Sequence, residues 1–565
     1  MNRLAKTDYS RWRMLDEDGK HTWHYLDDDE AARTWPQTLA DNAINGLKFF
    51  SKLQLPPGNW GCEYGGPMFL LPGVVIAWVV TETPIPQVYA IEIKNYLMAR
   101  ANPVDGGWGL HSEGDSSVFG TSLNYTVLRL LGVDSEHPVM VQARGLLHRL
   151  GGALNAPHWS KFWLAVLGVC DWEVVNPVPP EAWLLPDWVS VAPWRWWVHI
   201  RQVFLPMSWI WSKRWTAAET DVVRALRREL FVQPWESIEW AAHRNDIAPT
   251  DNYHPKSWLL NSVNWILSNI WIPYLRPRSL ATRAEDWVSK LIDMEDANSD
   301  YADLASVNGP LNMIVCYIRD GPDSYSVRRH RERMEEFLWV NKEGMLANGT
   351  NGVQCWDTAF LIQAVWSAGL AEDAQFKPML IQALEFLDRQ QIRENCQDQG
   401  VCYRHVRKGA WAFSNRDQGY GVSDCISEAL KAVIVLQKEA DGYPQLLEDQ
   451  RIFDAVDTLL TYQNPSGGCA SYEPTRGSEY LEMLNTAEVF GRIMVEYDYP
   501  ECTSAVLTAL VLFSKHWPDY RREEIQTFIH RGVDFIKTAQ RPDGSCLHHG
   551  LKFFVLLLSE AEEIA

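Results

Sequence analysis

A short recurring pattern constrains the fold of this chain most strongly: a helical segment ending in Gln, a polar link, then Gly and an aromatic residue. The clearest copy extends from Gly46 to Trp60 and contains Gln54 and Gly58. Looser copies cover residues 96–108, 456–469 and 532–546. The first of these lacks the Gln, and the other two have Cys in place of the aromatic. Such recurrence is typical of architectures built from stacked helix pairs.

The chain contains 28 Trp among 565 residues, far above ordinary usage, so indoles have a special role in it. In each repeat the Gln can bind backbone groups at a helix end, and the Trp can pack under the next helix. A further helix, 383–391, ends in Gln but lacks the following Gly and Trp. Helical periodicity elsewhere, as in 139–150 and 221–231, predicts an all-α fold.

Charge and segment lengths exclude several classes of protein. A net charge of -20 argues against a nucleic-acid partner, which requires clustered Lys and Arg. Residues 1–15 mix charges without an apolar core, so no signal peptide is expected. The longest apolar stretch, 68–80, contains Pro72 and Gly73 and is too short to span a bilayer. Ten Cys without CxxC spacing indicate reduced thiols rather than a disulfide framework.

Metal, phosphate and serine-nucleophile motifs are missing. Zinc sites usually place two ligands close in sequence, but only Cys396 with Cys402 and His548 with His549 come near this pattern. No GxxxxGK[ST], strand-linked GxGxxG or GxSxG is present. We therefore expect no metal.

One acid surrounded by thiols and aromatic residues remains. Asp424 lies before Cys425 at the entry to the apolar helix 429–437. Ser423 or Asp424 could simply cap that helix. Aromatic faces that stabilise cations occur in the same repeat array, at Trp356, Trp411, Phe413, Tyr420 and Tyr472. This combination favours an acid that starts carbocation chemistry.

These residues carry a resemblance to the oxidosqualene cyclases of the terpene cyclase/mutase family, in particular to fungal, lanosterol synthase-like members. The run 424–428, Asp-Cys-Ile-Ser-Glu, matches the family's Asp-Cys-Thr-Ala-Glu at the acid, the thiol and the glutamate. The repeats resemble its glutamine-tryptophan motifs. Further matches lie at 10–13, 22–25, 60–72, 202–208, 300–303, 349–358 and 499–504, so the resemblance covers about residues 8–544.

The resemblance implies roles around the acid. Asp424 would protonate the epoxide of 2,3-oxidosqualene and start ring closure to lanosterol or a related sterol-like triterpene. Cys425 and Cys502 would hydrogen-bond to this carboxyl, because donors stabilise the carboxylate left after proton transfer. Glu428 would return a proton to Asp424.

It also implies roles along the substrate. Trp356 and Phe413 would face the growing cation, and Trp197 would lie near the later rings. His199 and Tyr472 would steer or accept the final proton, although a lone His in an apolar run is often only a core residue. Tyr64 would lie on the substrate's path. No cofactor is implied.

Two α/α-barrel (toroid) domains are implied as well. Residues 1–60 would join the barrels, 61–320 would form an inserted barrel, and 321–565 the catalytic barrel. The family is monotopic, which predicts the surface of the endoplasmic reticulum membrane or of a lipid droplet. The Trp-rich stretch 194–215 suits an interfacial plateau, or alternatively an interdomain core face.

The chain departs from the family pattern in two places. The connector between Asp41 and Asn45 is short, and after Ser545 the sequence no longer follows the family. We therefore expect a catalytic barrel that lacks its C-terminal helices, with a pocket open to water and weak or no turnover.

Alternatives follow from this departure. The chain could be a truncated, non-catalytic lipid-binding relative. It could also be another α/α-barrel enzyme, but a prenyltransferase needs zinc ligands and a glycosidase needs a pair of carboxylates. Cyclases that act on squalene itself use an Asp-rich run to protonate an alkene, whereas the single Asp424 suits an epoxide better.

Overall fold

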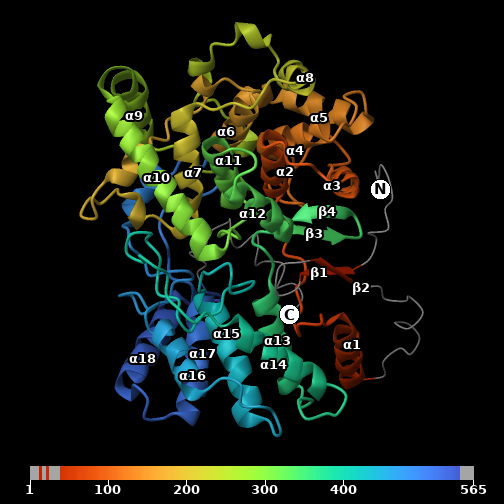
Figure 1. The fold of residues 1–565 in the computed structure, drawn as a ribbon, viewed down its shortest axis with the longest axis vertical. Coiled ribbons are helices and arrows are strands. Elements are labelled where there is room, and N and C mark those ends of the chain that lie inside the picture. Colours follow the sequence, from red (N-terminus) through yellow and green to blue (C-terminus); the bar gives the residue numbers. More distant parts are fainter. Residues whose placement is uncertain (1–11, 16–20, 25–37, 547–565) are drawn as a thin grey trace.

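The computed structural model describes residues 12–15, 21–24 and 38–546, with only the backbone for the first two segments. Helices form nearly all of its regular secondary structure and lie in an upper and a lower group along the long axis (Figure 1). This confirms the all-α prediction. The adjacent histidines His548 and His549, and parts of the matching segments 10–13 and 22–25, lie outside the described residues.

The upper group contains α2 to α12 and a small hairpin (Figure 1). Its helices are α2 (Leu70–Val80), α3 (Gln87–Arg100), α4 (Val118–Leu130), α5 (Pro138–Arg149), α6 (His158–Leu167), α7 (Val198–Lys213), α8 (Asp221–Leu230), α9 (Trp258–Ile266), the π-helical η8 (Leu267–Leu275), α10 (Arg278–Ser299), α11 (Asn308–Asp320) and α12 (Tyr325–Arg333). Short 3-10 turns are η1 (Gly152–Asn155), η2 (Trp172–Val174), η3 (Pro180–Leu184), η4 (Pro193–Arg195), η5 (Trp235–Ser237), η6 (Trp240–His243), η7 (Pro249–Asp251) and η9 (Met334–Phe337).

Two antiparallel hairpins accompany the upper group. β3 (Leu338–Asn341) pairs with β4 (Gly344–Ala347), and β1 (Trp12–Leu15) pairs with β2 (His21–His24). β4 packs on α3, so the β3–β4 hairpin belongs with the upper helices. Helix α12 belongs with them as well, because it packs on α11. The predicted division at residues 60 and 320 stays a prediction.

The lower group consists of α13 (Gln354–Ser367), α14 (Lys377–Gln390), α15 (Ser423–Ile434), the π-helical η10 (Val435–Glu439), α16 (Asp449–Leu459), the 3-10 turn η11 (Glu479–Leu484), α17 (Pro500–His516) and α18 (Arg522–Ala539). The N-terminal helix α1 (Leu39–Leu53) lies beside them (Figure 1). α15 is the central helix, since it packs against both α13 and α17.

The Gln residues of the repeats connect the outer helices of the lower group. The Gln54 amide donates to Gly58 in its own turn and to Met379 of α14, both at 2.8 Å. Two other glutamines repeat this scheme, from Gln391 to Gly409 and Arg451 of α16, and from Gln463 to Gly467 and Phe528 of α18. These bonds link α1, α14, α16 and α18 in series, which confirms the predicted role of Gln.

The Trp of a repeat makes its hydrogen bond to the helix that precedes it, rather than to the next one. The indole N–H of Trp60 donates to the Phe50 carbonyl of α1 at 2.8 Å. Trp411 donates in the same way to Leu387 of α14. With Gly409, Trp411 completes the repeat of Gln391, so the prediction that this copy lacks its Gly and Trp was wrong. The loop 392–408 separates them in sequence and hides the pattern.

Buried ion pairs hold the upper and lower groups together. Arg201 of α7 donates to Glu473 with a 3.0 Å bond from Nη2 to Oε2, and both side chains are buried. Lys256, just before α9, pairs with Glu488 at 2.7 Å. Removing one partner of such a pair leaves a buried charge without compensation, so these contacts fix how the groups dock.

The stretch 194–215 lies inside the protein. Trp197, Trp209 and Trp211 are only 2%, 4% and 1% exposed, and α7 is buried over nearly all its length. Because α7 is buried and packs on α10 and α11, the interfacial-plateau hypothesis was wrong, and the alternative of a buried core face is favoured. Tryptophan content alone does not distinguish a membrane-facing surface from a buried one.

Candidate active site

Asp424 lies in the first turn of α15, one residue after the helix begins. The helix starts without a side-chain cap: the Ser423 hydroxyl donates instead to the Ala470 carbonyl at 2.6 Å. The Asp424 carboxylate accepts from the backbone amide of its neighbour Cys425 at 2.7 Å. This bond joins adjacent residues and is not an N-capping bond, since the N-cap position is Val422. The capping interpretation of these residues was therefore wrong, and Asp424 is free for another role.

Two cysteines accompany the carboxyl group of Asp424. Its Oδ2 lies 3.7 Å from the Cys502 Sγ of α17, and its Oδ1 accepts from the Cys425 amide. Burial raises the pKa of Asp424 to about 6, although the hydrogen bonds from Cys425 and Cys502 lower it in part. The side chain keeps some accessible surface, whereas both cysteines are buried. A carboxyl with such a pKa can hold a proton near neutral pH and still release it.

Three aromatic rings lie in series beside the acid. Phe413 packs between Tyr64, at 5.1 Å between ring centroids, and Trp356 of α13, at 5.3 Å with nearly parallel planes. Burial raises the pKa of the Tyr64 phenol, and nearby Cys425 and Asp424 raise it further. Its hydroxyl has no hydrogen-bond partner among the described residues. Tyr64 therefore connects the aromatic series to the acid.

A second aromatic cluster contains the predicted terminal base. His199 stacks on Trp197 at 4.1 Å and meets Tyr472 edge-on at 4.7 Å. Burial lowers the pKa of His199 to about 3, and the charge of Arg201 contributes, so the imidazole is neutral. Burial likewise raises the pKa of Tyr472 well above its usual value, to which Tyr64 and Asp424 add. The two clusters therefore border each other.

An apolar cavity lies beside Tyr64, Trp197 and His199, and its lining does not include Asp424, Trp356, Phe413 or Tyr472. The space between atoms in this region is about 570 Å³, part of which is open to solvent. Tyr64, Trp197 and His199 contribute to its wall. The other lining residues are Pro67, Leu70, Trp159, Ile200, Val203, Ala305, Val307, Gly349, Thr350 and Ile493. The wall offers a hydrocarbon contact almost everywhere and few polar groups.

Glu428 lies one turn after Asp424 on α15, and its charge contributes to the raised pKa of Asp424. Its own carboxylate accepts from the amide of Gln363 at 2.8 Å and pairs with Lys431 at 2.9 Å. Its role in proton return stays a prediction. Sequence reasoning missed both partners, although Lys431 stands three residues after Glu428 on a predicted helix, a spacing typical of ion pairs.

A second Asp–Cys pair was also missed. Asp357, in the first turn of α13, accepts from the Cys62 amide at 2.9 Å. Burial raises the pKa of Asp357 to about 6. Trp60, two residues before Cys62, binds the Thr358 hydroxyl through its amide. This pair fastens the segment after α1 onto α13, and it provides a structural counterpart to the pair at Asp424.

A largely buried acid with cysteine neighbours, close to two aromatic clusters and an apolar cavity in an all-helical fold, is typical of a cyclase that acts on a long apolar isoprenoid. Family models for the squalene-hopene cyclase N-terminal and C-terminal domains match residues 47–342 and 353–551. The chain belongs to this family, in its oxidosqualene cyclase, lanosterol synthase-like branch.

Individual relatives place it more closely. It is 92% identical to the lanosterol synthase erg7B of Aspergillus fumigatus, in an alignment over all of this chain and 83% of the relative. It is 64% identical to the lanosterol synthase ERG7 of Gibberella zeae, over 96% of this chain and 73% of that protein. The human lanosterol synthase is 43% identical over 95% of this chain and 76% of its own length.

Proposed function

We propose that this chain protonates the epoxide of 2,3-oxidosqualene and cyclises it to lanosterol. The observation that carries the proposal is Asp424, whose pKa of about 6 and cysteine neighbours suit proton donation beside an apolar cavity. The lanosterol synthases among its relatives support the product. The reaction is an isomerisation in which one proton enters and one leaves, so its balance requires no cofactor.

Asp424 would act as general acid on the epoxide oxygen. After the proton leaves, the carboxylate is stabilised by the Cys425 amide, by the Cys502 thiol and by its place at the start of α15, where the helix dipole favours negative charge. Opening of the epoxide would then produce a cation on the carbon chain. The acid would therefore supply the proton that starts the reaction.

The rest of the pocket would guide the cation and end the reaction. The faces of Trp356, Phe413 and Tyr64 can stabilise passing positive charge, and the apolar wall excludes water that would trap it. The neutral imidazole of His199, next to Tyr472, can accept the last proton, because a carbocation is a far stronger acid than an imidazolium.

The proposed location is a membrane surface, at the endoplasmic reticulum or a lipid droplet. Among the described residues, no helix is both long and apolar enough to cross a bilayer. However, the continuous segment α9–η8, residues 258–275, contains no charged residue and exposes several large apolar side chains. Trp258, Trp265 and Tyr274 are 72%, 60% and 80% exposed. Helix α9 lies at the left edge of Figure 1, and the exposed apolar side chains of α9–η8 support interfacial binding.

Expression in a host that lacks its own sterol cyclase tests the function. We expect lanosterol in the lipid extract of cells carrying the chain and none in cells carrying an empty vector. A different tetracyclic alcohol would overturn the assignment of lanosterol as the product but would agree with Asp424 as the general acid. Folded protein that binds an oxidosqualene analogue without forming product would favour the alternative, a lipid-binding relative, and would agree with the weak turnover expected from sequence.

The Cys502→Ala variant should shift the pH dependence of cyclisation. Activity requires protonated Asp424, so kcat/KM should fall as pH rises through about 6 in the wild type. The Cys502 hydrogen bond lowers the pKa of Asp424, so its loss should move this falling limb to higher pH. The rate on the acidic side should drop by about tenfold, because a bond to the developing charge is lost.

Cys170→Ala is the matched control, since Cys170 is also a buried thiol but lies in the upper group. Its profile should coincide with that of the wild type. Profiles of kcat/KM measured with detergent-dispersed substrate would settle the point. A Cys502→Ala limb that moves to lower pH, or not at all, would contradict the assignment of this thiol.

A further inference from the structure

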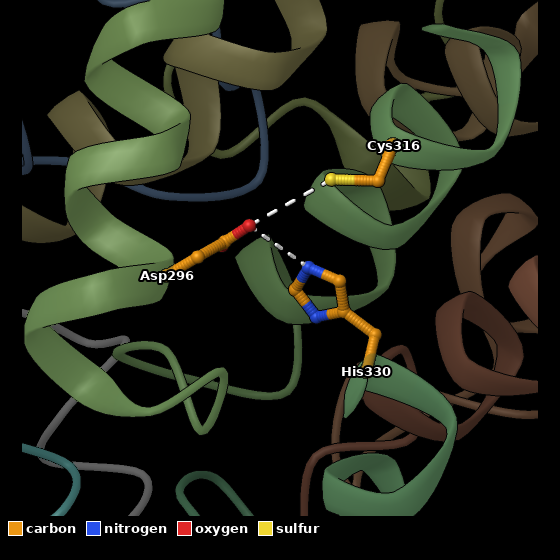
Figure 2. A group of neighbouring side chains, drawn as sticks. All are labelled: Asp296, Cys316 and His330. Carbon is orange, nitrogen blue, oxygen red and sulfur yellow. Dashed lines mark hydrogen bonds and ion pairs between the residues drawn. The ribbon is translucent and has the colours of Figure 1, made fainter. Parts of the chain in front are cut away.

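A second cluster of reactive side chains lies away from the cyclisation pocket, where α10, α11 and α12 converge. Asp296 of α10, Cys316 of α11 and His330 of α12 point toward one another (Figure 2). The Asp296 Oδ2 lies 3.2 Å from the His330 Nε2 and 3.7 Å from the Cys316 Sγ. All three residues are buried, and none of them lines the cavity described above.

We propose that Asp296, Cys316 and His330 bind a zinc ion that fastens the three helices together. Carboxylate oxygen, thiolate sulfur and imidazole nitrogen are all established zinc ligands. In a tetrahedral site with ordinary zinc bond lengths, neighbouring ligand atoms are roughly 3.3–3.5 Å apart. The three atoms lie within 4.8 Å of one another, and the two shorter separations are close to those expected values.

Residues around the cluster orient its ligands. The other ring nitrogen of His330, Nδ1, lies 3.7 Å from the Asp303 Oδ2. A carboxylate behind the second nitrogen of a histidine is the usual support for a zinc-binding imidazole, because it fixes the ring and its tautomer. The Asn312 amide donates to the Asp296 Oδ1 at 3.4 Å, on the oxygen opposite the proposed metal bond. Asp303 and Asn312 are therefore placed to hold two of the three proposed ligands, His330 and Asp296, in position.

The charges of the cluster also call for a cation. Asp296 and Asp303 are both buried carboxylates. The nearby Arg319 is engaged by Asp293 and Asp320. A divalent ion would compensate the charge of these two buried carboxylates.

These three ligands do not form a recognisable sequence motif, because no two of them are close along the chain, so no metal was expected here. The three residues are separated by 20 and 14 positions, and only the packing of consecutive helices brings them together. The proposed ion is structural, since the cluster and the acid Asp424 lie on different groups of helices. Its presence does not depend on the proposed cyclase activity, and neither result decides the other.

Metal analysis of the purified full chain tests the proposal. After growth with added zinc and dialysis against metal-free buffer, inductively coupled plasma mass spectrometry should find about one zinc ion per chain. Replacement by Co²⁺ should give a thiolate-to-cobalt absorption band in the near ultraviolet. Cys316→Ser should abolish that band, and Cys170→Ala, which changes a remote buried thiol, should keep both the band and the metal.

A strong chelator provides a measurement that needs no variant. It should lower the melting temperature of the wild type, and added zinc should restore it, because a ligand that binds only the folded chain stabilises it. Folded wild type with little bound metal and a melting temperature unaffected by chelator would overturn the proposal and leave a cluster held by shared protons. Full zinc content and an intact cobalt band in Cys316→Ser would overturn it as well.

Discussion

Asp424→Asn should abolish measurable cyclisation, with a fall in kcat of about 10³-fold or more, because the amide cannot give a proton to the epoxide. The Asn side chain has almost the same shape as Asp, so the substrate should still enter the pocket and the variant should still bind a substrate analogue. Product formation from oxidosqualene by purified enzyme, followed by gas chromatography, measures the effect. Analogue binding by the same preparation shows that the pocket is intact.

Asp357→Asn is the matched control for this variant. Asp357 also stands in the first turn of a helix, has a pKa raised by burial to about 6 and binds a cysteine amide. It fastens a connecting segment and has no proposed part in proton transfer. We expect turnover within about threefold of the wild type for folded protein, at a lower melting temperature. Equal losses in both variants would show that Asp424 acts only through stability.

Removing two exposed aromatic residues from α9–η8 should release the protein from membranes. In Trp265→Ser/Tyr274→Ser, the apolar surface that enters the lipid is lost, which corresponds to about a 100-fold weaker partition onto vesicles. With a net charge of -20, electrostatic attraction to anionic lipid contributes little, so the effect should be similar on neutral phosphatidylcholine vesicles. Flotation of protein with vesicles gives the bound fraction.

The control for membrane binding is Leu39→Ser/Val104→Ser. These residues are 88% and 86% exposed, more than the aromatic pair, but they belong to α1 and to the loop after α3, on the right side of Figure 1. Their loss should leave flotation unchanged. If both double variants floated like the wild type, the α9–η8 surface would have no part in membrane binding, whereas an equal loss in both would indicate general apolar adsorption.

The periodic parts of the fold were predictable from sequence, because the repeats act locally. Gln54 and Trp60 make their bonds within one repeat and to the adjacent helix, so their spacing carries the information. The repeat of Gln391 was missed because a loop separates it from Gly409 and Trp411. A pattern search finds a repeat only where the chain keeps the spacing.

The surfaces were not predictable in the same way. Residues 194–215 and 258–275 are both rich in Trp and apolar residues, yet α7 is buried and α9–η8 exposes several large apolar side chains. What distinguishes them is the partner that each helix packs against, such as Glu473 for Arg201. Such contacts join residues far apart in the chain, and no local pattern encodes them.

In the candidate site, too, neighbouring residues were predictable from sequence, whereas contacts between separate helices were not. Asp424 and Cys425 are neighbours and were found together, whereas the place of Cys502 came from a resemblance rather than from spacing. The partners of Glu428 were missed, and so was the cluster at Asp296, because each depends on how separate helices pack. Residue types that carry chemistry can be chosen from sequence, but their distances require the tertiary structure.

The buried pairs between Arg201 and Glu473 and between Lys256 and Glu488 have a consequence for heat inactivation. The acid belongs to one group of helices, while Trp197 and His199 on the cavity wall belong to the other. A slight separation of the two groups would admit water to the chamber before any helix melts. We therefore expect turnover to be lost at a lower temperature than helical content, because the docking of the two halves, rather than the stability of either, would limit the working range of the enzyme.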